Sequence, residues 1–313
     1  MSSALRLDGK VAVVTGSGRG LGRAYAIALA AAGAAVVVND IDGDAAQETV
    51  AAISDAGGRA TTEVAAVGDT ATAGALVQRA VDDFGRLDVM CTNAGVLRDR
   101  VLWKMTDEDF DLVLHTHLRG TFTCARAAAV QMRKQGEEGR ILVVGSPAGQ
   151  RGNFGQTNYA AAKAGVAAFA RSWALELARD AITVNALIPI AWTQMTASIA
   201  VYAPLADDVA AGAPLPRQVR QAHGIGTPED SASLVVFLAS EAAGGVTGQA
   251  IGLGGDRLSL WSHPAEAAIA FREGGWSAED IAQSWSSTVG AAAQSYGIQL
   301  PPLELDAARE RAS

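Results

Sequence analysis

The chain has 313 residues, of which 49% are apolar and 19% charged, and this composition is typical of a globular protein. Lysine and arginine number 25 against 33 aspartates and glutamates, so the net charge is -8. That sign argues against nonspecific nucleic-acid binding, which depends on cationic contacts to phosphate. The uncharged apolar run at residues 24–38 is too short to span a bilayer. We expect one large domain plus an extension, with neither nucleic acid nor a membrane as partner.

Cys91 and Cys124 are the two cysteines of the chain. We expect both to be small buried apolar side chains rather than a disulfide or a catalytic thiol. The beginning of the chain shows no charged-then-apolar secretion signal. These features predict a reducing, cytoplasmic location.

Strand and helix signals alternate along the chain. Short apolar runs predict strands at 11–14, 35–38, 63–67, 87–90, 140–144, 182–188 and 249–253. Helical patterns occupy 21–32, 45–56, 107–135, 157–179 and 229–240. This alternation indicates an α/β fold in which helices cover both faces of a parallel sheet.

Two stretches fall outside the alternation. Residues 193–227 form a long connection, and connections of that length are usually functional, so we expect a substrate lid there. The tail, residues 257–313, contains three of the six tryptophans and a helix-start signal at 277–280. We therefore expect a catalytic domain over 1–256 and a C-terminal helical extension over 257–313 that packs on the domain or on a partner subunit.

A glycine-rich turn, T-G-S-G-R-G-L-G at 15–22, follows the first predicted strand and opens the first helix. Glycines there let the backbone approach a pyrophosphate, which then lies on the helix N-terminus. Asp40 ends the second strand, where a carboxylate accepts the ribose hydroxyls of NAD and repels a 2′-phosphate. Arg19 favours NADP instead, and Asp40 could be a mere cap for the helix near Gly43. We weigh Asp40 more heavily and predict NAD.

Tyr159 and Lys163 open the helix at 157–179 and lie one turn apart on the same face. A free tyrosine has a pKa of about 10, and a nearby ammonium is expected to lower the Tyr159 pKa to roughly 7–8, where it can act as a base. Ser146 ends the fifth strand, at the reactive edge of a parallel sheet, and its hydroxyl could bind a substrate carbonyl. Each residue alone is ordinary, but with the glycine turn they predict a hydride-transfer site.

These motifs, together with Asn93-Ala94-Gly95 after the fourth strand, resemble those of the short-chain dehydrogenase/reductase family. The resemblance implies a single doubly wound, Rossmann-like domain around a seven-stranded parallel sheet. A narrower likeness is to the (3R)-hydroxyacyl-CoA dehydrogenase part of peroxisomal multifunctional enzymes, carried by V-V-V-N-D at 36–40, L-R-D-R at 97–100, H-L-R-G at 117–120, G-N-F-G-Q-T-N-Y at 152–159 and W-S-A-E-D-I-A-Q-S-W at 276–285.

Carried over residue by residue, the resemblance makes Tyr159 the base, Lys163 the group that tunes its pKa, and Ser146 the residue that orients the carbonyl. The cofactor contacts it implies are Gly16, Arg19, Gly20, Leu21, Gly22, Asp40, Ala66, Val67, Asn93, Ala94, Gly95, Tyr159, Lys163, Pro189 and Thr193.

The chain departs from the family pattern at three positions. His117 stands where most of the family has an asparagine that organises a proton-relay water, so it joins the catalytic candidates, with a core-packing residue as the plainer interpretation. Ala66 replaces an aspartate near the adenine, and Ile190 replaces the glycine that usually follows Pro189. The other histidines have no metal-ligand spacing with His117, so no metal is expected.

The sequence thus predicts an NAD-dependent oxidoreductase that interconverts a secondary alcohol and a ketone, with 3-hydroxyacyl-CoA and 3-ketoacyl-CoA as the first choice. A steroid or polyketide-type oxidoreductase is the alternative within this class. A non-catalytic NAD-binding sensor or scaffold is the alternative outside it, suggested by His117 alone. The resemblance also implies a homodimer or homotetramer.

Overall fold

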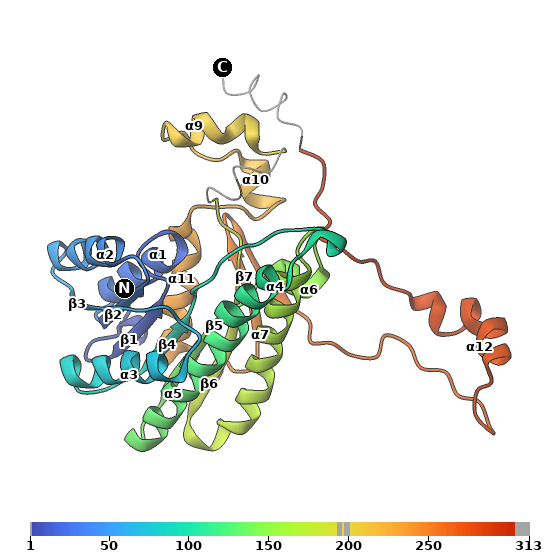
Figure 1. Ribbon diagram of the computed structural model, residues 1–313, viewed down its shortest axis with the longest axis horizontal. Coiled ribbons are helices and arrows are strands. Elements are labelled where there is room, and N and C mark those ends of the chain that lie inside the picture. The colour runs from blue at the N-terminus through green and yellow to red at the C-terminus, as the bar shows by residue number, and fades with distance from the viewer. Residues whose placement is uncertain (1, 193–195, 197–200, 304–313) are drawn as a thin grey trace.

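The computed structural model describes residues 2–192, 196 and 201–303 (Figure 1). Eight strands form one sheet in the order β3-β2-β1-β4-β5-β6-β7-β8. They are β1 Val11–Thr15, β2 Ala35–Asp40, β3 Arg59–Val64, β4 Val89–Thr92, β5 Gly139–Val144, β6 Ile182–Pro189, β7 Ala250–Gly254 and β8 Arg257–Trp261. The first seven are parallel, and β8 is antiparallel to β7. The predicted doubly wound α/β fold is confirmed, with one strand more than the seven expected.

Helices cover both faces of the sheet. One layer contains α1 Gly20–Ala31, α2 Gly43–Asp55 and α11 Pro228–Ala239, and the other contains α3 Thr70–Phe84, α5 Gly120–Gln135 and α7 Thr157–Glu176 (Figure 1). Ala12 and Val14 of β1 join the core beneath the first layer, whereas Val11 and Val13 join the core beneath the second. Both faces of β1 are therefore apolar because successive side chains point to opposite faces of a strand.

The sheet places a crevice beside β1. This strand pairs with β2 on one side and with β4 on the other, so the chain turns away to opposite faces after β1 and β4. In open α/β sheets, ligands bind outside the carboxyl ends of the strands at such a point. The glycine turn follows β1 here, and Asn93-Ala94-Gly95 follows β4.

The helix α3 was not predicted from the sequence. It opens with the weak helix formers Thr70 and Thr72, yet Ala73, Leu76, Val77 and Ala80 are buried on one face. The helix predicted at 107–135 is divided into α4 Asp107–Leu114, a π-helical turn at His115–Arg119, and α5. The third strand begins four residues before the predicted one, at Arg59 rather than Glu63.

The strand β8 lies in the tail that was expected to be a helical extension. Gly255, with φ of 53°, and Asp256 form the tight turn between β7 and β8. Leu258 and Leu260 are 69% and 67% exposed, so this strand lacks the buried apolar run by which the other strands were predicted. The predicted helix start at Ser277 is confirmed: a capping box of Ser277 and Asp280 begins α12 Ala278–Ser284, on an arm that projects from the body (Figure 1).

Beyond β6, the described part of the connection before α11 contains α9 Ala206–Ala210 and α10 Arg217–Gln221. Five of its residues, Tyr202, Leu205, Leu215, Val219 and Ile225, form a small separate core. This segment therefore has packing of its own above the carboxyl end of the sheet (Figure 1).

Candidate active site

Ser146 lies just beyond the end of β5. It is the N-cap of the short helix α6 Pro147–Arg151, and its Oγ accepts a hydrogen bond from the Ala148 N–H at 3.2 Å. Ser146 also lies close enough to the Tyr159 hydroxyl to lower the pKa of that group. The two residues that the sequence placed thirteen positions apart thus meet at the reactive edge of the sheet.

Lys163 lies one turn after Tyr159 on α7 and is buried. Its Nζ donates a hydrogen bond to the Val144 carbonyl at 2.5 Å, which fixes the ammonium beneath the site at the end of β5. The Nζ is 5.6 Å from the centre of the Tyr159 ring. Strand β5 and helix α7 therefore position all three predicted catalytic groups, Ser146, Tyr159 and Lys163.

The charges of this site differ from those expected. Burial lowers the pKa of Lys163 to about 7. Burial also raises the pKa of Tyr159, and the hydrogen bond from Ser146 opposes that rise. The expectation that Lys163 lowers the Tyr159 pKa is therefore not confirmed: desolvation of two buried groups outweighs their mutual interaction, and Ser146 is the group that favours the phenolate.

His117 is buried in the π-helical turn and its ring makes an edge-to-face contact with Tyr159, with centres 5.1 Å apart. Its Nε2 lies 2.8 Å from the Val96 carbonyl oxygen and 3.1 Å from the Val96 nitrogen. Burial, and then the charge of Lys163, lower the pKa of His117 to about 3, so the ring is neutral at physiological pH. Its Nδ1 is buried without a hydrogen-bond partner among the described residues. His117 both packs in the core and borders Tyr159.

Asn93 ties the two loops of the crevice together. Its backbone N–H donates to Thr15 Oγ1 at 3.0 Å, and its Nδ2 donates to the carbonyls of Thr15 and Gly16, both at 3.0 Å. A Cβ on Gly16, whose φ is 60°, would lie 2.7 Å from the Ala94 Cα. A Cβ on Gly22 would lie 2.1 Å from the Gly16 carbonyl oxygen. These glycines are required by close backbone packing at the crevice.

The outer part of the glycine turn faces open space. Gly20, with φ of 56°, begins α1, and a Cβ there would meet no heavy atom of the described chain within 4 Å. Asp40 lies on the other side of the glycine turn. Its Oδ2 accepts a hydrogen bond from the Gly18 N–H at 2.9 Å, and its Oδ1 accepts one from the Asp42 N–H at 3.1 Å. Asp40 does not cap α2, because Asp42 is the N-cap. An open helix N-terminus beside a carboxylate fits a dinucleotide.

The remaining predicted cofactor residues lie at the same edge. Arg19 and Leu21 flank Gly20, Ala66 and Val67 follow β3, Gly95 packs on His117, and Pro189 ends β6. Ala66 is exposed, whereas Val67 packs on the core beneath α5. Ile190 is partly buried and packs beside the small core of the lid segment. Thr193 lies outside the described residues.

Sequence reasoning missed Asn158, which precedes Tyr159 and is fully buried. Its Nδ2 donates to the carbonyls of Arg98 at 3.1 Å and Asp109 at 3.0 Å, so it holds the loop between β4 and α4 against the start of α7. A buried asparagine next to a catalytic tyrosine gives no local signal, because its partners are about 50 to 60 residues away in the chain.

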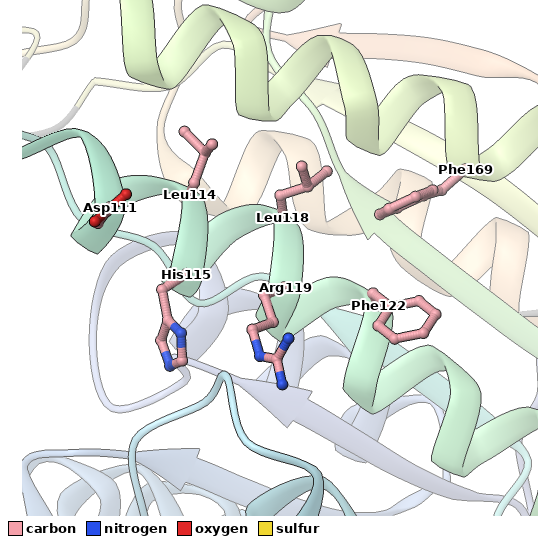
Figure 2. A pocket seen from close by; sticks show the side chains of 7 residues that line it. All are labelled: Asp111, Leu114, His115, Leu118, Arg119, Phe122 and Phe169. Carbon is pink, nitrogen blue, oxygen red and sulfur yellow. The ribbon is translucent and has the colours of Figure 1, made fainter. Parts of the chain in front are cut away.

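A pocket lies on the outside of the helical layer (Figure 2). It is lined by Asp111, Leu114, His115, Leu118, Arg119, Phe122 and Phe169. In Figure 2, Leu118 and Phe122 extend beside Phe169 of α7, while His115 and Arg119 extend to the opposite side. No predicted site residue lines this pocket, so it is separate from the catalytic crevice.

Both cysteines are free and buried, as expected. Over residues 2–192, 196 and 201–303, no helix is long and apolar enough to cross a membrane. In the same ranges, no group of three histidine, cysteine, aspartate or glutamate side chains could hold a metal ion.

A glycine turn at the switch point, together with Ser146 after β5 and with Tyr159 and Lys163 on α7, defines a nicotinamide-dependent oxidoreductase acting on CH–OH groups. The family described as Enoyl-(Acyl carrier protein) reductase matches residues 16–255. The chain belongs to the short-chain dehydrogenase/reductase family, as the sequence motifs predicted.

Similar proteins include named enzymes. The chain is 42% identical over 270 residues to "Hydroxyacyl-CoA dehydrogenase ChsB1" of Mycobacterium tuberculosis, covering 82% of this chain and 81% of that protein. It is 40% identical over 209 residues to "Peroxisomal multifunctional enzyme type 2" of Mus musculus, covering 64% of this chain but 28% of the mouse protein. A solved short chain dehydrogenase from Mycobacterium avium is 35% identical with a TM-score of 0.79, over 93% of this chain and 98% of the other.

Proposed function

We propose that the protein is an NAD-dependent dehydrogenase that interconverts 3-hydroxyacyl-CoA and 3-ketoacyl-CoA. The observation that carries the proposal is the placement of Ser146 beside Tyr159, with the buried Lys163 held one helical turn away by the Val144 carbonyl. The acyl-CoA part is supported by the similar mycobacterial protein, whose name is that of a hydroxyacyl-CoA dehydrogenase.

In the oxidation of a secondary alcohol, bound NAD⁺ supplies the hydride acceptor. Ser146 orients the substrate oxygen by hydrogen bonding. The Tyr159 oxygen, in its ionised phenolate form, takes the hydroxyl proton as the C–H bond breaks, the hydride passes to NAD⁺ and the C=O bond forms. The substrate thus loses a hydride and a proton, and Tyr159 holds the proton. Lys163, fixed by the Val144 carbonyl, lies one turn below the tyrosine with a pKa of about 7, which suits a group that gives and regains a proton at neutral pH.

NAD rather than NADP is supported by Asp40. Its carboxylate is fixed at the end of β2 by the N–H groups of Gly18 and Asp42. A fixed carboxylate there favours ribose hydroxyls and repels a 2′-phosphate.

We further propose that residues 193–227 are a substrate lid and that the end of the 257–313 extension is tied to it. Gly297 donates its N–H to the Arg151 carbonyl at 2.8 Å, at the end of the helix that Ser146 caps. Farther along, the Pro301 carbonyl lies 2.8 Å from His223 Nε2, and the Pro302 carbonyl accepts from Gln218 at 2.9 Å. The tail therefore runs from the catalytic edge to the described part of the lid.

The proposed homodimer or homotetramer is supported by apolar surface on the described chain. Phe122, on the outside of α5, is 37% exposed, and the Phe169 ring stacks on Trp173 at 4.4 Å along the neighbouring face of α7. On the arm, Phe271 is 91% exposed and Trp285 is 52% exposed. Large exposed aromatic side chains of this kind mark interaction surfaces. The cytoplasmic location stays a prediction from composition.

The test is a panel of 3-hydroxyacyl-CoA thioesters and steroid alcohols assayed with NAD⁺ and NADP⁺. We expect oxidation of the thioesters with NAD⁺, and a loss of about 10²–10⁴-fold in kcat for Tyr159→Phe with NADH binding retained. Oxidation of steroid alcohols alone would support the alternative substrate class. NADH binding without turnover of any alcohol would support a sensor instead.

A further inference from the structure

A second carboxylate lies beside the one that supports NAD. Asp42, in the turn between β2 and α2, forms an ion pair with the Arg19 guanidinium of the glycine turn. The Oδ1 of Asp42 also accepts a hydrogen bond from the Ala45 N–H at 3.1 Å, which caps α2. The Ala45 hydrogen bond, and with it the charge of Arg19, lower the pKa of Asp42, so the carboxylate is ionised at physiological pH.

Arg19 is a cation of the glycine turn, next to the residue that bonds Asp40. It is the N-cap residue of α1, and its side chain is 70% exposed. Its neighbour Gly18 donates its N–H to Asp40, so the glycine turn and the ribose carboxylate form one unit. Guanidinium groups bind phosphate oxygens through two parallel hydrogen bonds, and a free Arg19 here would attract the phosphate that Asp40 repels.

We propose that Asp42 is a second determinant of nucleotide choice, because its ion pair with Arg19 withholds this cation from the 2′-phosphate of NADP(H). This inference rests on the proposed use of NAD. Asp40 repels the phosphate, and Asp42 forms an ion pair with the arginine that would otherwise neutralise the charge of the phosphate. The arrangement accounts for an arginine in the glycine turn of a site built for NAD.

An exposed ion pair contributes little free energy in isolation. The effect of Asp42 on NADPH binding is therefore measured in a variant that lacks the negative charge of Asp40. The starting variant is Asp40→Asn, which removes the charge and keeps an acceptor oxygen for one of the two backbone N–H groups. Asp42→Asn is then added, because asparagine remains a good N-cap while losing the ion pair. The matched control adds Asp44→Asn, which removes an exposed acid from the same first turn of α2.

The probes are NADH and NADPH, which differ by the 2′-phosphate, titrated at equilibrium by their nicotinamide fluorescence without substrate. We expect Asp40→Asn/Asp42→Asn to bind NADPH at least about fivefold more tightly than Asp40→Asn, the effect of one charge-assisted hydrogen bond, with little change for NADH. Adding Arg19→Ala should abolish the gain. The gain should also shrink as salt is raised.

The inference is overturned if Asp44→Asn gives the same gain as Asp42→Asn, since the effect would then be general electrostatics. It is also overturned if the gain survives Arg19→Ala, or if no gain appears while NADH still binds. Failure of the unsubstituted protein to bind NADH is a different result: it removes the proposed NAD-dependent function, and this inference with it.

Discussion

The catalytic residues depend on neighbours that no motif describes. Gly95 packs directly against His117, and His117 in turn contacts the ring of Tyr159. The sequence identified Gly95 through a cofactor motif. The structure gives a second reason for a glycine at this position, because no side chain fits between the β4 loop and the π-helical turn. The position of Tyr159 thus depends on a glycine about 60 residues earlier in the chain.

Gly95→Ala tests this dependence. Its Cβ would lie 2.2 Å from His117 Cε1, and because that ring is buried it has no room to move. We expect a loss of about 1–3 kcal/mol in the free energy of unfolding, measured by denaturant titration, together with a reduced kcat. Adding His117→Ala should recover part of the loss, giving a favourable coupling energy in the double-mutant cycle.

Gly74→Ala is the matched control. Gly74 lies within α3, where a Cβ would meet no described heavy atom within 4 Å, so alanine should leave stability equal or raise it by about 0.5–1 kcal/mol. Equal losses from the two substitutions would contradict the argument from His117.

Lys163 gives a prediction about pH. Its pKa is about 7 in the folded protein, against about 10.4 in an unfolded chain, so between these values the unfolded state binds more protons. The free energy of unfolding should therefore rise with pH in this window, by up to about 1.4 kcal/mol per pH unit, and the gain should be lost as the pH falls to 7.

The measurement compares the cofactor-free protein with Lys163→Met at pH 7, 8 and 9, since methionine cannot titrate. From pH 7 to pH 9, the free energy of unfolding of the unsubstituted protein should rise relative to that of Lys163→Met. Lys134→Met, at an exposed lysine near the end of α5, should instead follow the unsubstituted protein. Parallel curves for Lys163→Met and the unsubstituted protein would show that Lys163 is charged in the fold.

At the scale of elements, the sequence predicted the strands whose side chains are buried on both faces and the helices whose apolar residues recur with a strong period. Strand β1, buried throughout, was located to within a residue. Strand β8 was missed because it is an edge strand with exposed leucines, and its pairing is by backbone hydrogen bonds that any sequence can make. The contacts of Asn158 were missed for a related reason, since they join segments that only the fold brings together.

The tie between tail and lid is testable by truncation. A chain that ends at Gln294 keeps the whole sheet, because β8 ends at Trp261, but it loses the contacts of Gly297, Pro301 and Pro302. We therefore expect faster hydrogen exchange over residues 201–225 and a raised KM for the alcohol, with NADH affinity unchanged. A chain ending at residue 303 keeps these contacts and should match the full chain. Equal exchange in both truncations would contradict a tethered lid.

At the scale of the whole molecule, Phe122 of α5 and Phe169 of α7 line the pocket that Figure 2 shows, and no predicted site residue lines it. This separation allows a subunit to pack there without covering the cofactor edge. The resemblance to the family gave the expectation of an oligomer, but the sequence could not locate its surface, because Phe122 and Phe169 lie on different helices and become neighbours only when α5 and α7 pack side by side.

Phe122→Glu should therefore lower the oligomeric state in sedimentation velocity, because association would take a charged group out of water into an apolar contact. The Arg126 guanidinium lies 4.9 Å from the centre of the Phe122 ring, so glutamate can pair with it in the free subunit and the variant should still fold. Ala51→Glu, an exposed position on α2 in the opposite helical layer, is the control and should sediment as the unsubstituted protein does. An unchanged oligomer in Phe122→Glu would place the contact elsewhere, and the apolar arm around α12 would then be the surface to substitute next.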